Sequence, residues 1–288
     1  MVRLPLLGSG GDYDHYDPDN VPDLNPRPEY LDDDLLYHIS GSEDEGTCKC
    51  SPETKVIIEM GYYENSIDDA FKGCREEMYE RVKTLLQEEL GLKEDFKKAW
   101  DKAKEGLQRK EKLNPSLQEL ALCAYTTKHI YRELNNKMRE GKGSYMTSFG
   151  LISLHFLMTD AIQARNPKAT CRTTYRRTTV SFTKIEKLVR FGSFASSTCN
   201  PYSPKFISYG KETCFVISTC HSAPISDLSV VPEEDEVLIP PYEVFKSEQL
   251  KYLHELSDCK VVYRLTSKGT KSNMKCVYVN QDKGKSPG

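Results

Sequence analysis

The chain has 288 residues, of which 38% are hydrophobic, 29% charged and 10% aromatic, and its formal net charge is −3. This balance is typical of a soluble globular protein and excludes a multi-span membrane protein and a disordered chain, because so many aromatic side chains require a buried core. Residues 1–50 carry 12 acidic and 3 basic residues, and the weakly basic remainder has no dense Lys/Arg run, so we expect an anionic small molecule and no nucleic acid as partner.

The first segment, residues 1–50, combines its acidic charge with spaced prolines, and we expect a disordered or loosely attached arm. The first eight residues have one charge and a short apolar run that Pro5 interrupts, and the C-terminal residues are polar. We therefore expect neither a signal peptide nor a lipid-anchor signal in this chain. Residues 51–288 are expected to form one domain.

Two halves with different periodicity follow. Residues 67–166 are expected to be helical. Apolar residues at three- and four-residue steps predict helices at about 67–112, with a break near Gly91, and after Pro115 to about 139. The segment 149–162 is nearly apolar all round, which predicts a buried helix. Residues 169–280 are rich in Val, Ile, Thr, Tyr and Phe between turn residues, which predicts strands at 171–180, 187–197, 212–219, 236–239, 260–266 and 274–280. Helices followed by strands indicate an α+β fold. The apolar segment 149–162 is too short to span a bilayer, and we expect no transmembrane segment.

The chain has ten cysteines and six histidines, and no two cysteines have the Cys-x-x-Cys spacing of a zinc or redox site. The histidines are scattered, so we expect no metal. Cysteines at this density favour structural disulfides and an oxidising, extracellular compartment.

An acidic cluster enters an apolar, strand-forming run at Val231–Phe245. If the strand begins near Glu234, then Glu234 and Glu236 project from one face, about 6.5–7 Å apart. Two carboxylates aimed at one spot repel each other, so they indicate a bound cation, a metal or paired acid and base roles. The alternative is an acidic turn exposed to solvent.

Two other segments carry candidate site residues. Thr173–Thr178 places arginines on the first predicted strand, where an arginine facing a cleft favours phosphate or carboxylate, although a surface arginine is the alternative. Val189–Thr198 ends in hydroxyl side chains, which in other proteins mostly satisfy neighbouring backbone groups.

In their order along the chain, these segments resemble the vertebrate arginine-specific mono-ADP-ribosyltransferase family, ecto-enzymes with an Arg–Ser–Glu-x-Glu signature. The resemblance covers roughly residues 55–280. The matching segments are Asp68–Cys74, Ala124–Thr126, Ile130–Tyr131, Leu154–Ala161, Cys171–Arg176, Val189–Ser197, Thr219–Cys220 and Glu234–Pro241.

The resemblance implies two packed antiparallel sheets that form an NAD cleft, with helices on the N-terminal side. It implies that Arg176 holds the NAD phosphates and that Ser196 positions Arg176 and the nicotinamide-side ribose. Glu236 matches the catalytic glutamate, and Glu234 matches the upstream glutamate that confers preference for arginine. Three further positions match residues that line the NAD site of the family: Tyr131, Ser193 and Ser229.

The implied activity is transfer of one ADP-ribose from NAD, or NADP, to an arginine of a target protein, with release of nicotinamide and without a metal. The resemblance also implies the disulfides Cys74–Cys276 and Cys171–Cys220 and a secreted or cell-surface location. We expect a monomer.

Two alternatives stay open. The first is an NAD glycohydrolase, in which water is the acceptor, but hydrolysis has no need of Glu234. The second is a catalytically silent extracellular interaction protein, although all three signature positions are retained. The chain departs from the family pattern at Arg177, where many relatives have glycine, and at Thr198.

Overall fold

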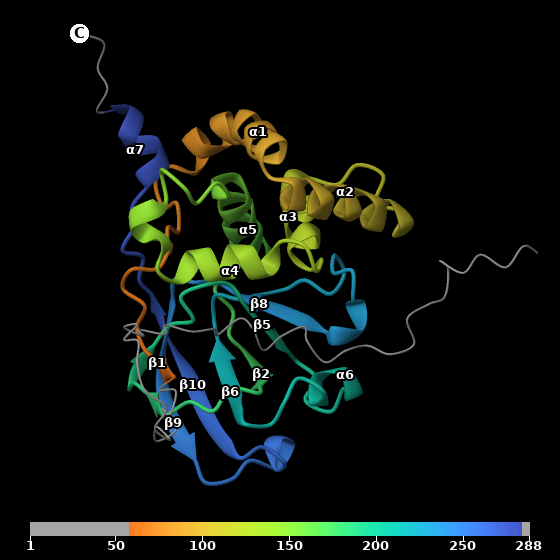
Figure 1. The fold of residues 1–288 in the computed structure, drawn as a ribbon. Coiled ribbons are helices and arrows are strands. Elements are labelled where there is room, and N and C mark those ends of the chain that lie inside the picture. The colour runs from red at the N-terminus through yellow and green to blue at the C-terminus, as the bar shows by residue number, and fades with distance from the viewer. Residues whose placement is uncertain (1–57, 284–288) are drawn as a thin grey trace, which may run out of the picture.

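The computed structural model describes residues 58–283, so the predicted acidic arm, residues 1–50, lies outside the described residues. In Figure 1 the helices α1 to α5 lie together above the strands. Within residues 58–283, no helix is long and apolar enough to cross a membrane.

Five helices form the first half, at the bounds α1 Arg75–Leu92, α2 Glu94–Arg109, α3 Leu117–Tyr125, α4 Tyr131–Arg139 and α5 Ile152–Arg165, with a short 3-10 turn η2 at Gly141–Ser144. The predicted break near Gly91 falls after Leu92. The helix predicted after Pro115 is two helices, and the first begins with a capping box in which Ser116 and Glu119 bond each other's backbone N–H groups.

Helix α5 is at the centre of this half, because its side chains are buried on every side from Ile152 to Ile162. Its first two N–H groups, those of Ile152 and Ser153, donate to the Glu89 carboxylate of α1 at 2.7 and 2.9 Å. A carboxylate at the positive end of a helix dipole stabilises the helix. Burial nevertheless raises the pKa of Glu89, because the charged form loses its hydration there.

Residues 58–283 contain ten strands. Strand β1 Glu59–Met60 precedes the helices, and the other nine lie in the second half, at the bounds β2 Arg172–Thr178, β3 Lys184–Ile185, β4 Leu188–Val189, β5 Ala195–Thr198, β6 Thr213–Thr219, β7 Ala223–Pro224, β8 Glu236–Ile239, β9 Glu243–Leu250 and β10 Val261–Thr270. Short helical segments complete it: α6 Pro204–Ile207, η3 Pro232–Glu234, η4 His254–Leu256 and α7 Val277–Lys283. Strands β1 and β3 form a two-stranded sheet, and the other eight are ordered β4-β9-β10-β6-β2-β5-β8-β7.

The predicted α+β class is confirmed, but the strands are arranged differently from two separate antiparallel sheets. Eight of the described strands form one mixed sheet in which β6 and β10 are parallel, and the small sheet of β1 and β3 is separate from it. Parallel pairing requires a long connection, and the 41 residues between the two strands, which include β7 to β9, provide it. The sheet is weakest between β2 and β5, where only Tyr175 and Thr198 pair, and the site described below lies at this junction.

Two local predictions are wrong. The strand predicted at 274–280 is helix α7, because the Asp69 carboxylate accepts the N–H of Val277 at 3.1 Å and so binds the first turn of a helix. The helix predicted from residue 67 begins only at Arg75, because Phe71 has a φ of 52°, in the left-handed region, and stops a helix there.

Three disulfides connect the described residues: Cys74–Cys276 and Cys171–Cys220, the two pairs that the resemblance implied, and Cys214–Cys259. The first ties the start of α1 to the start of α7 across 202 residues of sequence. Within residues 58–283, Cys123 and Cys199 are free thiols.

Candidate active site

A cavity of about 670 Å³ opens between the two halves of the molecule. Helix α2 and the α3–α4 loop line it on one side, and α6, η3 and the edge of β8 line it on the other. Both α2 and α6 are visible on the right of Figure 1. A much smaller cavity adjoins it and contains Arg176; the two share Ser196, Tyr209, Glu234 and Glu236. A volume of this size suits a ligand as large as a dinucleotide.

The shared wall is built on the antiparallel pair β5 and β8. Ser196 on β5 pairs with Leu238, and Glu236 at the start of β8 pairs with Thr198, so Ser196 and Glu236 are diagonal neighbours on one face. The Ser196 hydroxyl donates to Glu236 Oε1 at 2.6 Å. Glu236 is 5% exposed, so this carboxylate is buried and held in one orientation.

Arg176 reaches the same place from β2. Its side chain is buried, and Nη1 donates to the carbonyl oxygen of Ser196 at 2.7 Å. This bond spans the junction between β2 and β5, where the strands themselves share a single pair. Arg176 therefore connects the two parts of the sheet as well as carrying positive charge into the cavity wall.

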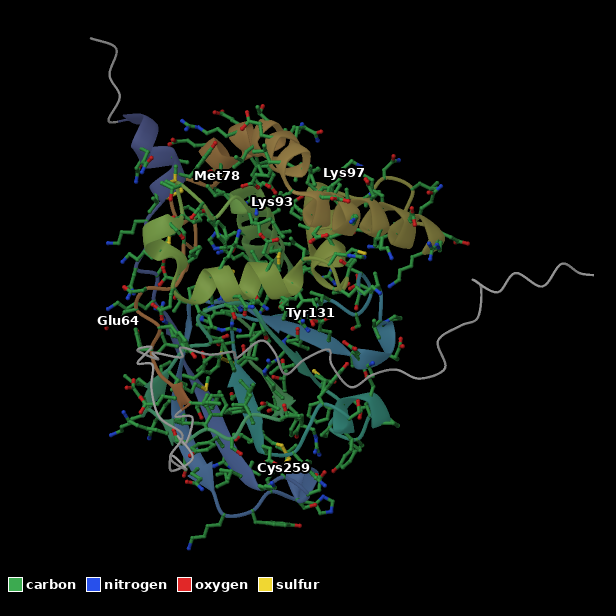
Figure 2. All side chains as sticks on the ribbon, viewed as in Figure 1. Glu64, Met78, Lys93, Lys97, Tyr131 and Cys259 are labelled. Carbon is green, nitrogen blue, oxygen red and sulfur yellow. A yellow bond between two sulfur atoms is a disulfide. The ribbon has the colours of Figure 1, made fainter. Side chains whose placement is uncertain are left out.

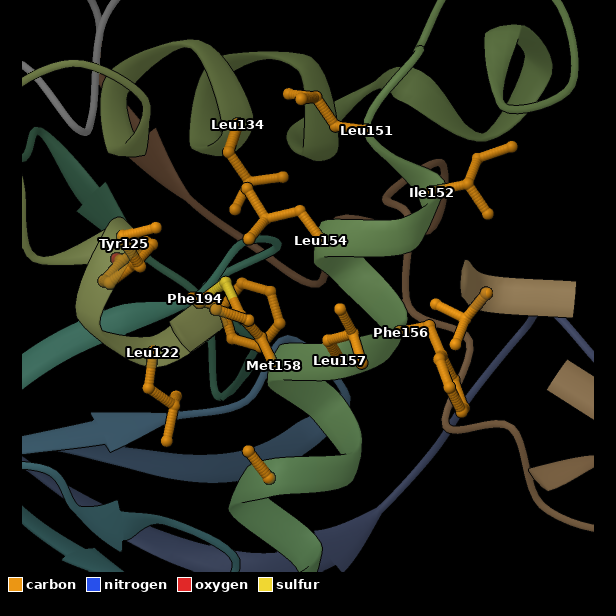
Figure 3. Close-up of a cluster of buried hydrophobic side chains, with 14 of the residues drawn as sticks. Leu122, Tyr125, Leu134, Leu151, Ile152, Leu154, Phe156, Leu157, Met158 and Phe194 are labelled. Atoms are coloured by element: carbon orange, nitrogen blue, oxygen red, sulfur yellow. The ribbon is translucent and has the colours of Figure 1, made fainter. Parts of the chain in front are cut away.

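The helical half holds β5 in place through Phe194. Phe194 and Tyr125 lie in the buried cluster of the helices (Figure 3), with their ring centres 6.1 Å apart. The Phe194 ring also lies 6.2 Å from that of the buried His155. Phe194 stands two residues before Ser196, so packing in the helical core determines where the serine lies. Aromatic pairs at these separations are favourable.

Glu234 does not lie on the strand, which corrects the expectation that β8 begins near it. Glu234 ends the 3-10 turn η3, and Asp235 follows in the left-handed conformation with a φ of 46°. This turn redirects the chain before β8 starts. Glu234 nevertheless lines the same two cavities as Glu236, so the carboxylates converge by way of a turn.

Tyr209, which the sequence analysis did not single out, donates its hydroxyl hydrogen to Glu234. Burial raises the pKa of Glu234, while this hydrogen bond and the positive charge of Lys205 act in the opposite direction. Burial and the neighbouring carboxylate raise the pKa of Tyr209, so its hydroxyl remains a donor. Its position beside Gly210 carries no sequence signal for such a role.

Tyr131 lies at the start of α4 and lines the large cavity, below the helices in Figure 2. Ser193 and Ser229 are buried and line neither cavity. The Ser229 hydroxyl accepts the N–H of Val231 at 3.1 Å, and its carbonyl accepts Lys110 Nζ at 2.6 Å, so Ser229 shapes the loop that leads to Glu234. Direct contact of Ser193 and Ser229 with NAD stays a prediction.

Arg177, the departure from the family pattern, is buried and forms two hydrogen bonds with the Asp258 carboxylate, at 2.9 and 2.8 Å. Its guanidinium also lies 5.1 Å from the centre of the Phe206 ring. The pairing lowers the pKa of Asp258. Arg177 therefore packs α6 and the β9–β10 connection against β2, which is a structural use.

The charges at the base of the cavity suit a cationic centre. Two carboxylates face one space, and a serine holds one of them while a tyrosine holds the other. Such an arrangement stabilises positive charge that develops during a reaction. Within residues 58–283, no group of three or more His, Cys, Asp or Glu side chains could hold a metal ion.

A family model described as NAD:arginine ADP-ribosyltransferase matches residues 60–273. The chain is 34% identical to ecto-ADP-ribosyltransferase 5 of Bos taurus over 231 residues, covering 73% of this chain and 72% of the relative. It is 36% identical to T-cell ecto-ADP-ribosyltransferase 1 of Mus musculus over 227 residues, covering 74% and 76%. It is 32% identical to the erythroblast NAD(P)(+)–arginine ADP-ribosyltransferase of Gallus gallus over 265 residues, covering 87% and 85%.

Among solved structures, the fold is similar to the crystal structure of the eukaryotic mono-ADP-ribosyltransferase ART2.2. The TM-score is 0.67 at 29% identity, over 76% of this chain and 99% of the other. A variant of ART2.2 in complex with NAD matches with a TM-score of 0.66.

Proposed function

The chain belongs to the NAD:arginine ADP-ribosyltransferase family, and from this premise we propose that it transfers one ADP-ribose from NAD to the guanidinium group of an arginine on a target protein. The observation that carries the proposal is the pair of carboxylates at the base of one cavity, Glu236 held by Ser196 and Glu234 held by Tyr209.

We assign the bond-breaking step to Glu236. The nicotinamide of NAD is already cationic, so it can leave without a general acid. Its departure leaves an oxocarbenium-like ribosyl cation, as in glycoside hydrolysis. A buried carboxylate with a fixed orientation stabilises that developing charge, since it needs no reorganisation when the charge appears.

We assign the binding and deprotonation of the acceptor arginine to Glu234. A guanidinium is protonated at neutral pH and is therefore a poor nucleophile. The Glu234 carboxylate can bind it and accept a proton as the nitrogen attacks the ribosyl carbon. A raised pKa suits this role, because a carboxylate that is less acidic than usual is a better proton acceptor.

Arg176 is proposed to hold the NAD phosphates, because its buried guanidinium enters the wall of the smaller cavity and a planar donor fork suits phosphate oxygens. Tyr131 is proposed to line the nucleotide site from α4. We further propose that residues 51–288 act as one catalytic domain at the cell surface or outside the cell, in keeping with the ecto-enzyme names of the relatives and the three disulfides.

The test measures nicotinamide release from NAD and ADP-ribosyl-agmatine formation by the oxidised, folded protein. Agmatine is a small guanidinium acceptor, so it reports transfer without a target protein. Glu236→Gln is expected to abolish both activities, and Glu234→Gln is expected to abolish transfer while NAD cleavage continues. Equal loss of both activities in the two variants would contradict this division of roles, and wild-type release without ADP-ribosyl-agmatine would favour the glycohydrolase.

A further inference from the structure

The opening of the large cavity carries more positive charge than the chemistry at its base requires. Five cationic side chains line the cavity: Lys102, Arg109, Lys110, Lys128 and Lys205. Three carboxylates line it, and two of them, Glu234 and Glu236, stand at the base beside Ser196. That leaves one carboxylate, Glu105, among the cations nearer to solvent.

One face of α2 contributes much of this charge. Lys102, Glu105, Gly106 and Arg109 all line the cavity, and their spacing of three and four residues places them along a single face of the helix. Glu105 pairs with Arg109 at 3.3 Å. Lys102 is exposed and forms no ion pair among the described residues.

A second positive group faces α2 from the α3–α4 loop. Lys128 is exposed and also lacks an ion pair within the described part of the chain. His129, between these groups, has a lowered pKa because it is partly buried and because Lys102 and Lys128 both repel its protonated form. The two lysines therefore act on one region of the opening, although they come from different elements.

We propose that this basic rim, defined as Lys102, Arg109 and Lys128, selects target arginines that are flanked by acidic side chains; the inference rests on the proposed function. The arginine side chain must enter the cavity to reach Glu234, so its neighbours on the target stay at the opening. A cationic rim attracts carboxylates at those positions and repels lysines. It also repels the approaching guanidinium itself, and flanking carboxylates offset that repulsion.

The test compares kcat/KM for three acceptors: agmatine, a peptide with one arginine between glutamates, and the same peptide with lysines in place of the glutamates. The wild-type protein is expected to modify the glutamate peptide roughly tenfold more efficiently than the lysine peptide, the scale of two exposed charge pairs. High ionic strength is expected to reduce this ratio, because salt screens exposed charges.

Two variants, Lys102→Glu and Lys128→Glu, are expected to lower the ratio of kcat/KM for the glutamate peptide to that for the lysine peptide. Each variant is expected to raise kcat/KM for the lysine peptide and to lower it for the glutamate peptide. Their KM for NAD is expected to match the wild type. Their activity toward agmatine is expected to stay the same or rise, because each change removes a positive charge that repels the entering guanidinium. Lys104→Glu is the matched control. Lys104 is exposed on the same helix as Lys102 but does not line the cavity, so this substitution makes the same change of charge outside the rim. It is expected to leave the ratio unchanged.

Equal use of the two peptides by the wild-type protein would overturn the inference. So would a raised KM for NAD with unchanged peptide preference in the Lys102 and Lys128 variants, because the rim would then bind the NAD phosphates. If the wild-type protein cleaves NAD but modifies neither agmatine nor a peptide, the proposed function fails and this inference fails with it. Transfer to agmatine with no peptide preference refutes the inference alone.

Discussion

Removing the Tyr209 hydroxyl tests how this side chain controls Glu234, the carboxylate that we propose binds the acceptor guanidinium. Tyr209→Phe keeps the ring and its packing but deletes the hydrogen bond to Glu234. A hydrogen bond to a charged group contributes about 1.5–3 kcal/mol. Glu234 is only half-buried, and water can replace part of the lost bond, so we take the lower value of about 1.5 kcal/mol. This corresponds to a loss of roughly tenfold in kcat/KM for agmatine.

The same variant has a predicted pH dependence. Burial raises the pKa of Glu234, and the Tyr209 hydrogen bond partly counteracts this by favouring the charged form. Without the hydroxyl the pKa rises further, so Glu234 takes up its proton at a higher pH. The acid limb of the transfer profile is therefore expected to move to higher pH in Tyr209→Phe, while nicotinamide release in the absence of acceptor keeps its profile.

The assay measures both products in parallel across the pH range, with Tyr252→Phe as a control at an exposed tyrosine outside both cavities. An unchanged acid limb for transfer would refute the reasoning, because the hydroxyl would then have no influence on Glu234. An equal fall in transfer and NAD cleavage would also refute it, because Tyr209 would then act on the whole site.

Three further changes have defined outcomes. Ser196→Ala deletes the hydrogen bond to the buried Glu236 carboxylate, the proposed catalytic group, and is expected to slow nicotinamide release roughly 10- to 100-fold at saturating NAD. A loss below about threefold would contradict the proposed role of Ser196. Arg190→Met leaves Asp68 without its ion-pair partner where both side chains are fully buried, and urea unfolding is expected to show a loss of about 3–5 kcal/mol, whereas a loss under about 1 kcal/mol would mean that Asp68 does not need Arg190. Reduction of Cys74–Cys276 is expected to destabilise the fold by about 3–5 kcal/mol, seen as a lower Tm, and an unchanged Tm would mean that its loop is already constrained in the unfolded chain.

The sequence was most informative where local periodicity and tertiary burial agree. Helices α1 and α2 show apolar residues at helical spacing, and most of these residues are buried in the structure. Helix α5 is apolar nearly all round in the sequence, and it is buried on every side from Ile152 to Ile162. Strands β2, β6 and β10 were likewise expected close to where they occur. Helix α7 was missed because its segment is locally strand-like, and the groups that stabilise its first turn, Asp69 and Cys74, lie about 200 residues away in sequence.

The two glutamates show the same limit within the site. Sequence reasoning brought Glu234 and Glu236 to one place by assuming an extended strand. In the structure a left-handed residue at Asp235 does this instead. The side chains that hold these carboxylates, Ser196 and Tyr209, are 40 and 25 residues away from their partners, so no local pattern pairs them.

The sequence by itself determined the α+β class and, through the ordered motif residues, the family to which the chain belongs. Both depend on residue types at short spacing, which periodicity and motifs record directly. The tertiary structure alone decided the parallel pairing of β6 with β10, the contact of Tyr209 with Glu234 and the basic rim shared by α2 and the α3–α4 loop. These features arise from groups that are distant along the chain, and only the packing of the two halves brings such groups within hydrogen-bonding or electrostatic reach of one another.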